Sequence, residues 1–498
     1  MNQWKWNARL AVLALLATTV TALGCTTIGH PAPTDRFQST YTELDAYVAE
    51  PDPAYGFEVV ATNRGAGETT YVLEMTSQEW LTPAEVDRTV WRHALVITVP
   101  DVIETNTAFL MIGGGSNDRA MSEYGTQFAQ MAVATRAIAA QLYHVPNQPL
   151  TFAGAEPRWE DALIAWGWDK FLRGERAEWL ARLPMTKAVV RAMDTVQHFA
   201  ASAEGGGHHV NDFVVAGGSK RGWTAWTTAA VDDRVVGVIP IVIDMLNMDP
   251  SFEHHWRVYG FWAPAVGDYV RMGTMNWRGH PRSDELNSIV EPYQYRDRYT
   301  MPKLIMNATG DQFFLPDSSQ FYWDQLPNPK YLRYVPNANH SLRDTNAPES
   351  IRTFFEAIAY NQKLPQYEWT VEKDGVIFMR TDTIPKSVHL WWADNPDTRD
   401  FRLETIGPAW KSERLIPVRP GDYRAQVRAP EQGWRAFFIE MTFTSPSGAL
   451  HTFTTEVKVI PNVYPYEYIP PVWPVQPQAA METGAAMETD VTMETAAR

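Results

Sequence analysis

The sequence predicts an α/β protein with a mostly parallel sheet covered by helices on both faces, followed by a small all-β domain of sandwich type. For the first part, strand-length runs alternate with helical patterns, and the runs are continuously apolar, as is typical of strands buried on both faces. For the second part, the chain changes after residue 363 to short alternating strands separated by Asp-Gly, Asn-Pro, Pro-Gly and Ser-Gly turns.

The N-terminus predicts export. Basic residues precede an apolar run that is too short to span a membrane, and we expect residues 1–24 to be a signal peptide of the lipoprotein type. The chain's one cysteine, Cys25, ends an Ala-Leu-Gly-Cys stretch that resembles a lipobox, with the leucine one place late. Cys25 would then be lipidated and residues 25–40 would form a tether, in the periplasm or at the outer membrane. An ordinary signal cleaved nearby is the alternative, and a disulfide framework is excluded either way.

The composition narrows the possible partners. With 498 residues the chain is long enough for two domains, and a net charge of −15 argues against a nucleic-acid surface. The expected membrane contact is the N-terminal lipid anchor. The sequence does not predict an oligomeric state.

The first domain is expected over residues 41–363. Strands are predicted at 71–75, 93–99 and 108–112, and the last runs into Gly113, Gly114 and Gly115. A glycine run after a strand is where an oxyanion loop would lie, so we expect Gly114 and Gly115 to join the N–H of Lys220 in an oxyanion hole. A flexible turn is the alternative.

Helical patterns and further strands follow in alternation. Helical spacing covers the ranges 128–143, 160–171 and 186–200, and strands are predicted at 150–152 and 235–243.

One serine stands between a buried strand and a helix. Residues 213–216 predict the strand, 223–230 predict the helix, and Ser219 lies in the glycine-rich turn between them. This order is typical of a nucleophile elbow, although Arg221 stands where the usual pattern has glycine. The alternative is a turn with a surface serine.

Residues 244–298 break the alternation. This segment is aromatic and irregular, and we interpret it as a lid or pocket wall inserted between strands of the sheet. Together with Arg221, the candidate pocket residues are Asp244, Asn247, Trp256 and Tyr259. For each residue of the segment taken alone, core packing is the alternative.

An acid and a base follow the last two strands of this domain. Asp311 comes after the strand predicted at 302–308, and His340 after that at 331–335. The order Ser219, Asp311, His340 is that of the Ser–Asp–His hydrolases. Asp317, in the same loop as Asp311, is the rival for the acid. A helix over 348–360 closes the domain.

The all-β domain is expected over residues 364–465. Its strands are predicted at 369–371, 376–380, 388–392, 423–427, 434–443 and 451–460. Residues 466–498 are rich in proline and then repeat Met-Glu-Thr, which predicts a disordered tail.

Several motifs are similar to one known family. GGSKRGWTAW, PIVIDMLN, MPKLIMNATGDQFFLPDSSQFY and VPNANH resemble the PhoPQ-activated pathogenicity-related proteins, over roughly residues 40–460. The resemblance implies an exported protein of α/β-hydrolase fold with a serine-hydrolase-like site at Ser219, Asp311 and His340. It implies no substrate, and the family's name refers to a regulatory system linked to virulence.

The elbow sequence also looks like that of glucuronoyl esterases, in which a cation beside the serine helps to bind the oxyanion. Lys220 or Arg221 would take that part here. In the alternative, Arg221 points back and anchors a neighbouring loop through a carboxylate.

The sequence therefore predicts a serine hydrolase of the bacterial cell envelope that acts on a small-molecule or peptide substrate. Ester hydrolysis is the first choice, and a peptidase remains open. A non-catalytic binding or signalling protein on the same scaffold is the competing hypothesis. No metal and no cofactor is predicted, because no HExxH, cysteine-based, dinucleotide or phosphate-loop motif is present.

Overall fold

A computed structural model of the chain describes residues 41–372 and 375–471. The expected signal peptide 1–24, Cys25 and the tether 25–40 lie outside the described residues, as does 472–498 of the expected tail. Within the described ranges, no helix is both long and apolar enough to cross a membrane.

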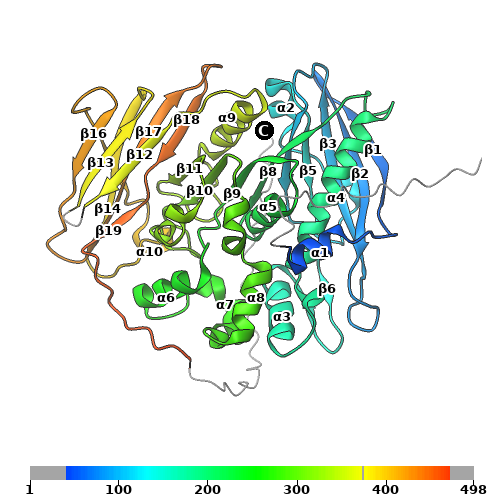
Figure 1. Cartoon of the computed structure of the whole chain (residues 1–498), viewed down its shortest axis with the longest axis horizontal. Helices are drawn as coiled ribbons and strands as arrows, with labels where there is room; N and C mark the ends of the chain where they lie inside the picture. The colour runs from blue at the N-terminus through cyan, green and yellow to red at the C-terminus, as the bar shows by residue number, and fades with distance from the viewer. Residues whose placement is uncertain (1–40, 373–374, 472–498) are drawn as a thin grey trace, which may run out of the picture.

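The centre of the molecule is a nine-stranded sheet with the order β1-β2-β3-β5-β4-β8-β9-β10-β11 (Figure 1). Its strands are β1 Gly56–Arg64, β2 Glu68–Glu79, β3 Val90–Pro100, β4 Thr107–Ile112, β5 Ala139–Leu142, β8 Asp212–Gly218, β9 Val235–Ile241, β10 Lys303–Ala308 and β11 Lys330–Val335. The strands from β5 to β11 pair in parallel, whereas β1, β2 and β3 pair antiparallel. This mostly parallel order, with a serine turn after β8 and loops carrying an acid and a base after β10 and β11, is the α/β-hydrolase arrangement.

The sheet is buried on both faces. Alternate residues of β4 enter two different cores: Leu110 packs with the residues of α3, α4 and α5, whereas Phe109 packs with α2 and α9. The helices are α1 Glu43–Ala49, α2 Ala129–Thr135, α3 Glu160–Leu172, α4 Arg182–Ala201, α5 Lys220–Val231 and α9 Ala347–Ala359. Two buried faces explain why the strand sequences are continuously apolar.

The predicted helix over 128–143 is wrong in its second half. The structure has α2 only to Thr135, where Arg136 adopts a left-handed conformation (φ 46°) and ends the helix. The chain then enters β5, which pairs with β3 on one side and β4 on the other. The alanines of this stretch suit a helix, but pairing between two buried strands decides the outcome.

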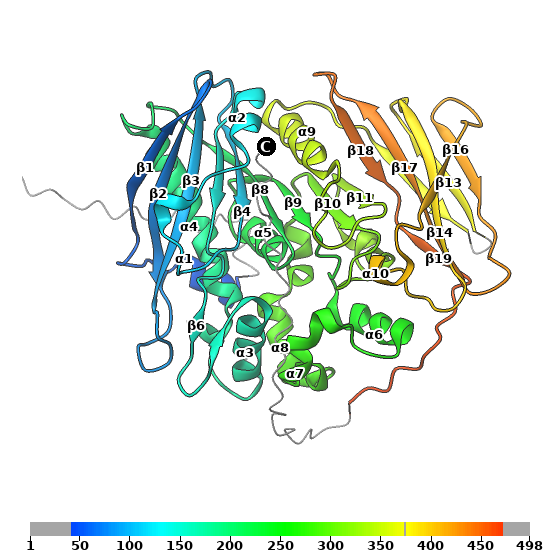
Figure 2. The ribbon, with the colours of Figure 1, turned by 180° about the vertical axis from the view of Figure 1, so that it is seen from behind.

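The segment 244–298 lies between β9 and β10 and is helical rather than irregular. It contains α6 Met248–Tyr259, α7 Gly267–Arg271 and α8 Pro281–Val290, joined by short 3₁₀ turns. Figures 1 and 2 show these helices together with α3 at one end of the sheet.

The C-terminal part forms separate antiparallel sheets. One sheet contains β12 Tyr367–Val371, β13 Val376–Thr381 and β16 Asp422–Gln426; the other contains β15 Lys411–Arg414, β14 Ser387–Asn395, β17 Trp434–Thr444, β18 Leu450–Thr454 and β19 Lys458–Ile460. Ile377 and Met379 from the first sheet share a core with Phe437 and Ile439 from the second. The N–H of Tyr334 on β11 donates to Thr454 Oγ1 at 3.0 Å, so these sheets also contact the edge of the central sheet.

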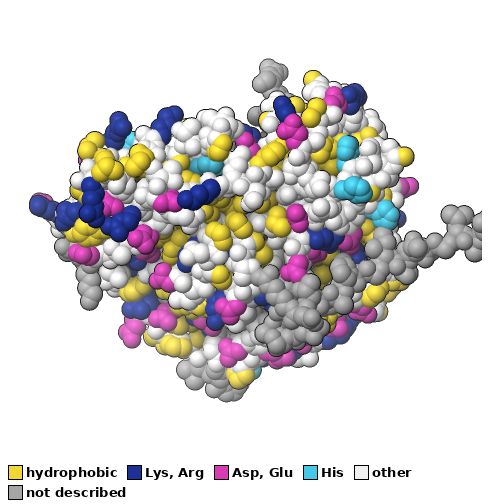
Figure 3. Space-filling view, turned by 45° about the horizontal axis from the view of Figure 1, so that its top comes forward, with side chains coloured by type: hydrophobic (Ala, Val, Ile, Leu, Met, Phe, Trp, Pro, Cys, Tyr) yellow, Lys and Arg dark blue, Asp and Glu magenta, His cyan; other side chains and the backbone are white. Residues whose placement is uncertain are grey.

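The surface charge is uneven despite the negative total. Figure 3 shows Lys and Arg side chains gathered at its left edge, over the C-terminal sheets. Exposed basic residues of this part include Lys411, Arg414, Arg419 and Arg424.

Residues 461–471, here called the C-terminal strap, leave β19 and run along the inserted helices (Figures 1 and 2). The hydroxyl of Tyr464 lies 3.0 Å from His254 Nδ1, and the N–H of Tyr466 donates to the carbonyl of Arg257 at 3.1 Å. Residues 466–471, which the sequence assigns to the disordered tail, therefore still contact the folded protein.

Candidate active site

The turn between β8 and α5 holds Ser219 in a strained conformation. Its backbone angles are φ 56° and ψ −127°, in a region that residues other than glycine seldom adopt. The Ser219 N–H donates to the carbonyl of Ile241 on β9 at 2.7 Å, which ties the turn to the sheet. A strained serine between a strand and a helix is the geometry of a nucleophile elbow.

Two glycines allow α5 to approach β8 closely. A Cβ at Gly217 would lie 2.3 Å from the carbonyl oxygen of Arg221, and one at Gly222 would lie 2.8 Å from the carbonyl oxygen of Gly217. Neither position has room for a side chain. The second glycine comes one place later than in the usual pattern, and Arg221 occupies the usual place.

Asp311 and His340 form a buried pair. Oδ2 of Asp311 lies 2.8 Å from Nδ1 of His340, and both side chains are buried. The other carboxylate oxygen accepts the N–H of Phe313 at 2.7 Å, which orients the carboxylate. With Nδ1 donating to Asp311, Nε2 is the ring nitrogen left to accept a proton.

The rival acid, Asp317, belongs to a different network. Its Oδ1 lies 2.8 Å from Nε2 of His254, and its Oδ2 accepts from Nη2 of Arg399 at 2.8 Å. Burial would raise the pKa of Asp317, but His254 and Arg399 hold it well below its usual range. The structure therefore pairs Asp311 with His340 and Asp317 with His254.

A cavity of about 70 Å³ lies beside the elbow. Ser219, Phe313 and Phe314 are among its lining residues. The rings of both phenylalanines also contact His340, with centroids 4.3 Å and 6.1 Å from that of the imidazole. The serine and the Asp–His pair are thus connected through the residues around one cavity.

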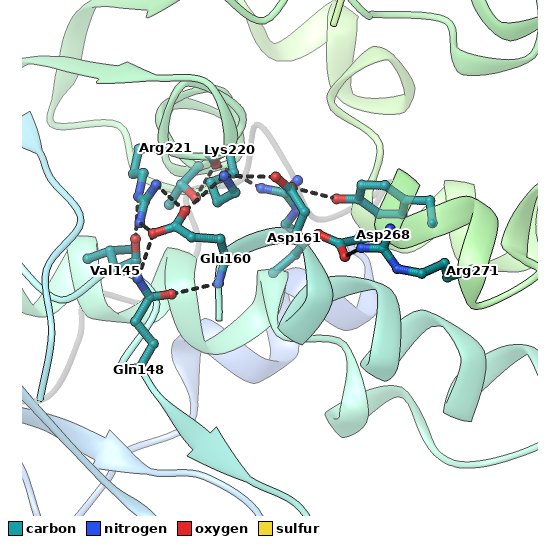
Figure 4. Close-up of polar contacts among 11 residues, drawn as sticks. Val145, Gln148, Glu160, Asp161, Lys220, Arg221, Asp268 and Arg271 are labelled. Atoms are coloured by element: carbon teal, nitrogen blue, oxygen red, sulfur yellow. Dashed lines mark hydrogen bonds and ion pairs between the residues drawn. The ribbon is translucent and has the colours of Figure 1, made fainter. Parts of the chain in front are cut away.

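Lys220 and Arg221, the two cations after the serine, both bind Glu160 at the start of α3 (Figure 4). Arg221 forms two hydrogen bonds of 2.6 Å with this carboxylate, and its Nε donates to the carbonyl of Val145 at 2.6 Å. Nζ of Lys220 lies 2.8 Å from Glu160 and 3.0 Å from Asp161. Burial would raise the pKa of Glu160, but Arg221 and Lys220 hold it well below its usual range. Arg221 therefore anchors a neighbouring loop and helix.

The glycine loop after β4 lies against this cluster. A Cβ at Gly114 would lie 2.6 Å from Nη2 of Arg221. Gly115 has a φ of 144°, and its carbonyl accepts from Nε2 of Gln148 at 3.1 Å. Lys220 is the first residue of α5, where backbone N–H groups have no acceptor within the helix. The residues predicted for an oxyanion hole thus belong to one loop and one helix start that meet at Arg221.

A sequence model of the PhoPQ-activated pathogenicity-related proteins matches residues 44–402. The chain belongs to this family.

One relative of this chain is autocrine proliferation repressor protein A from Dictyostelium discoideum. It is 37% identical over 457 residues, which cover 85% of this chain and 92% of the relative. Solved structures with some likeness include an acetyl xylan esterase from Paenibacillus sp. R4 (15% identity, TM-score 0.46, 66% of this chain and 97% of the other). A glucuronoyl esterase from Solibacter usitatus shows 13% identity and a TM-score of 0.38 over 66% of this chain and 94% of the other.

The five residues predicted for the substrate pocket are not among the described residues that line this cavity: Arg221, Asp244, Asn247, Trp256 and Tyr259. Asp244 instead accepts hydrogen bonds of 2.6 Å from the hydroxyls of Tyr322 and Tyr334. Burial raises the pKa of Asp244 to about 7.

The other predicted pocket residues of the insertion serve its packing, either within the insertion or against neighbouring segments. Asn247 donates to the carbonyl of Phe321 at 3.0 Å. Trp256 packs on another tryptophan of the insertion, and Tyr259 is buried beneath the guanidinium of Arg402. These contacts correspond to the core-packing alternative.

The lining that the sequence did not single out includes Met248 and Phe252 of α6 and Phe313 of the acid loop. The sequence contains a signal for Met248 and Phe252, because residues four apart on a helix share one face. Among the described residues, no three His, Cys, Asp or Glu side chains come together as a metal site.

Proposed function

We propose that this protein is a serine hydrolase that cleaves esters, with Ser219, His340 and Asp311 as its triad. The observation that carries the proposal is the buried contact of 2.8 Å between Asp311 and His340, beside the cavity that the strained Ser219 lines. A peptidase would use the same residues. The ester is preferred because an alcohol is a better leaving group than an amine and needs less complete protonation by His340 as it departs.

The proposed reaction follows from the roles of these groups. Oγ of Ser219 attacks the substrate carbonyl carbon while Nε2 of His340 takes the hydroxyl proton, and Asp311 stabilises the imidazolium through Nδ1. The backbone N–H of Lys220, with those of Gly114 and Gly115, would hold the oxyanion. The imidazolium then protonates the departing alcohol, and water releases the acyl group from Ser219 by the same steps.

Labelling with a fluorophosphonate probe tests the proposal, because such probes react with an activated serine whatever the substrate. We expect the native protein to be labelled and Ser219→Ala to remain unlabelled. Ser288→Ala, which removes an exposed hydroxyl on α8, is the matched control and should label normally. A folded native protein that takes up no probe would overturn the proposal.

The proposal includes export with a lipid on Cys25, in the periplasm or at the outer membrane. It rests on the lipobox-like sequence before Cys25. Incorporation of labelled palmitate in the producing cell, and its loss in Cys25→Ser, would support it. Equal incorporation in the two proteins would exclude this anchor.

A second candidate function is signalling without catalysis. It is favoured by the 37% identity to a relative named as an autocrine proliferation repressor. Under this candidate, a folded native protein would not react with the probe, and Ser219→Ala would bind partners as well as the native protein does. Labelling of Ser219 by the probe would exclude the candidate of signalling without catalysis.

A further inference from the structure

We propose that the substrate of the site at Ser219 is an ester that carries one carboxylate, and that Arg182 and Arg278 bind this group. The inference rests on the proposed function and names the substrate class of the same site. Three observations carry it: a buried guanidinium beside the elbow, carboxylates that are already bound to other cations, and a second arginine in the same cavity wall.

Arg182, the first residue of α4, lies buried beside the nucleophile elbow. It lines the same cavity as Ser219, and only 3% of the residue is exposed. Its Nη1 donates to the carbonyl of Lys220 at 2.8 Å, and its guanidinium carbon lies 4.5 Å from the ring centroid of Trp223. These contacts fix a positive charge against the residue that follows the proposed nucleophile.

The carboxylates of this cluster already bind other cations (Figure 4). Glu160 contacts Arg221 at 2.6 Å and Lys220 at 2.8 Å. Asp161 lies 3.0 Å from Nζ of Lys220. With Arg182 as the third cation, three enclosed positive charges share two carboxylates.

The charge of Arg182 therefore lacks a counter-ion of its own. Within the described residues, its Nε also has no hydrogen-bond acceptor. Burial lowers the pKa of Arg182 below its ordinary value, and a buried guanidinium without a carboxylate is costly. A ligand carboxylate in the cavity would supply the missing negative charge.

Arg278, a second arginine of the wall, follows the 3₁₀ turn Thr274–Trp277 of the insertion. Its Nη2 donates to the carbonyl of Asp249 at 2.6 Å and lies 3.6 Å from the carboxylate of that residue. The Asp249 side chain is 48% exposed, so water weakens this pair. In the described part of the chain, Nε and Nη1 of Arg278 have no acceptor. Arg278 can therefore bind a ligand anion while it keeps its contacts with Asp249.

The balance of charge indicates the class of anion. The charged side chains that line the cavity, with those joined to them by ion pairs, are four cations and three carboxylates: Arg182, Lys220, Arg221 and Arg278, and Glu160, Asp161 and Asp249. One carboxylate balances this excess, whereas a phosphate group with nearly two negative charges would reverse it. Guanidinium groups also match the planar shape of a carboxylate.

The first experiment measures kcat/KM of the full-length protein for two pairs of esters. In one pair, p-nitrophenyl monoesters of pentanedioic acid carry a free carboxylate or the same group capped as a methyl ester. In the other, the acetyl ester of 3-hydroxybenzoate or of its methyl ester places the charge in the leaving group. After subtraction of the rate with Ser219→Ala, we expect the charged ester to be favoured at least about tenfold in one pair. A preference for the neutral ester in both pairs would overturn the inference.

Two variants tie the preference to these side chains. The ratio of charged to neutral kcat/KM should fall about tenfold in Arg182→Gln and about threefold in Arg278→Gln, mainly through KM. Arg257→Gln, on α6 in the same insertion but outside the lining, is the matched control and should keep the native ratio. If Arg182 served the oxyanion instead, Arg182→Gln would lower kcat for charged and neutral esters alike. That result, or a native ratio in both arginine variants, would overturn the inference.

A binding measurement covers the case in which Arg182→Gln does not fold, as judged by thermal unfolding. Calorimetric titration of Ser219→Ala compares monomethyl pentanedioate with the neutral dimethyl ester and with inorganic phosphate. We expect the monoanion to bind at least about tenfold more tightly than either, and Arg278→Gln in the same background to reduce this difference. Tighter binding of the diester or of phosphate would contradict the proposed carboxylate site.

The outcomes separate this inference from the proposed function. Fluorophosphonate labelling of Ser219 together with a preference for neutral esters would overturn the carboxylate inference and leave the hydrolase proposal intact. No labelling and no turnover of any ester would overturn the hydrolase proposal itself, and with it the substrate class.

Discussion

Two aspartates in one loop have different surroundings. Asp311 contacts His340, whereas Asp317 is shared between His254 and Arg399 and is fully enclosed by the insertion, the C-terminal sheets and the strap. At the scale of single residues, the first carboxylate is placed to orient an imidazole, and the second neutralises a buried guanidinium.

Replacing each aspartate by asparagine should separate these roles. Asp311→Asn removes the acceptor that fixes the His340 tautomer, so we expect kcat for the best ester to fall roughly 10³- to 10⁴-fold with little loss of stability. Asp317→Asn leaves the positive charge of Arg399 uncompensated, so the free energy of unfolding should fall by about 3 kcal/mol while turnover changes far less. Steady-state kinetics and denaturant unfolding of both variants check this. If the Asp317→Asn variant were stable but inactive, Asp317 rather than Asp311 would be the acid of the triad.

The elbow also depends on how closely one helix and one strand pack. The Cβ position of Gly217 lies 2.3 Å from the carbonyl of Arg221, whereas nothing lies within 4 Å of that of Gly218. At the scale of elements, the first glycine sets the distance between β8 and α5, and the second does not.

Two alanine substitutions test this difference. Gly217→Ala forces the start of α5 away from β8, so we expect a loss of about 1–3 kcal/mol in unfolding free energy and loss of labelling at Ser219. Gly218→Ala has open space for its methyl group and should change stability by less than about 0.5 kcal/mol. Urea unfolding curves measure both. If the two substitutions had equal effects, Gly217 would not be required for the close approach of α5 to β8.

Much of the central sheet could be predicted from sequence because each buried strand is a continuous apolar run. The order of Ser219, Asp311 and His340 could be predicted for the same reason, since each follows such a run. The cavity lining could be predicted only in part: the spacing of Met248 and Phe252 places them on one face of a helix, but it does not show that this face turns toward Ser219. The polar residues Asp244 and Asn247 looked chemically suited to a pocket but satisfy buried neighbours instead.

Four distant segments meet in one buried network. His254 of the insertion, Asp317 of the acid loop, Arg399 of the C-terminal part and Tyr464 of the strap are in mutual contact. At the scale of the whole molecule, the C-terminal sheets and the strap therefore support the insertion that forms the cavity wall.

Ending the chain after Pro461 should loosen α6. This change removes the hydrogen bonds of Tyr464 and Tyr466 to the insertion, each worth about 0.5–1.5 kcal/mol, and the contact of Tyr468 with Arg278. Amide hydrogen exchange measured by mass spectrometry should speed up roughly tenfold or more over Met248–Tyr259. Exchange in β4 (Thr107–Ile112) provides an internal reference and should not change. Unaltered protection of α6 would mean that the strap adds no support.

The cavity wall contains three thioethers, those of Met245, Met248 and Met275. Oxidation converts a methionine into a polar sulfoxide. A cavity whose wall includes three methionine side chains is therefore expected to be sensitive to peroxide, even though the proposed nucleophile is not a thiol. Reduction of the sulfoxides would restore the thioethers of the wall, so such a loss of binding would be reversible.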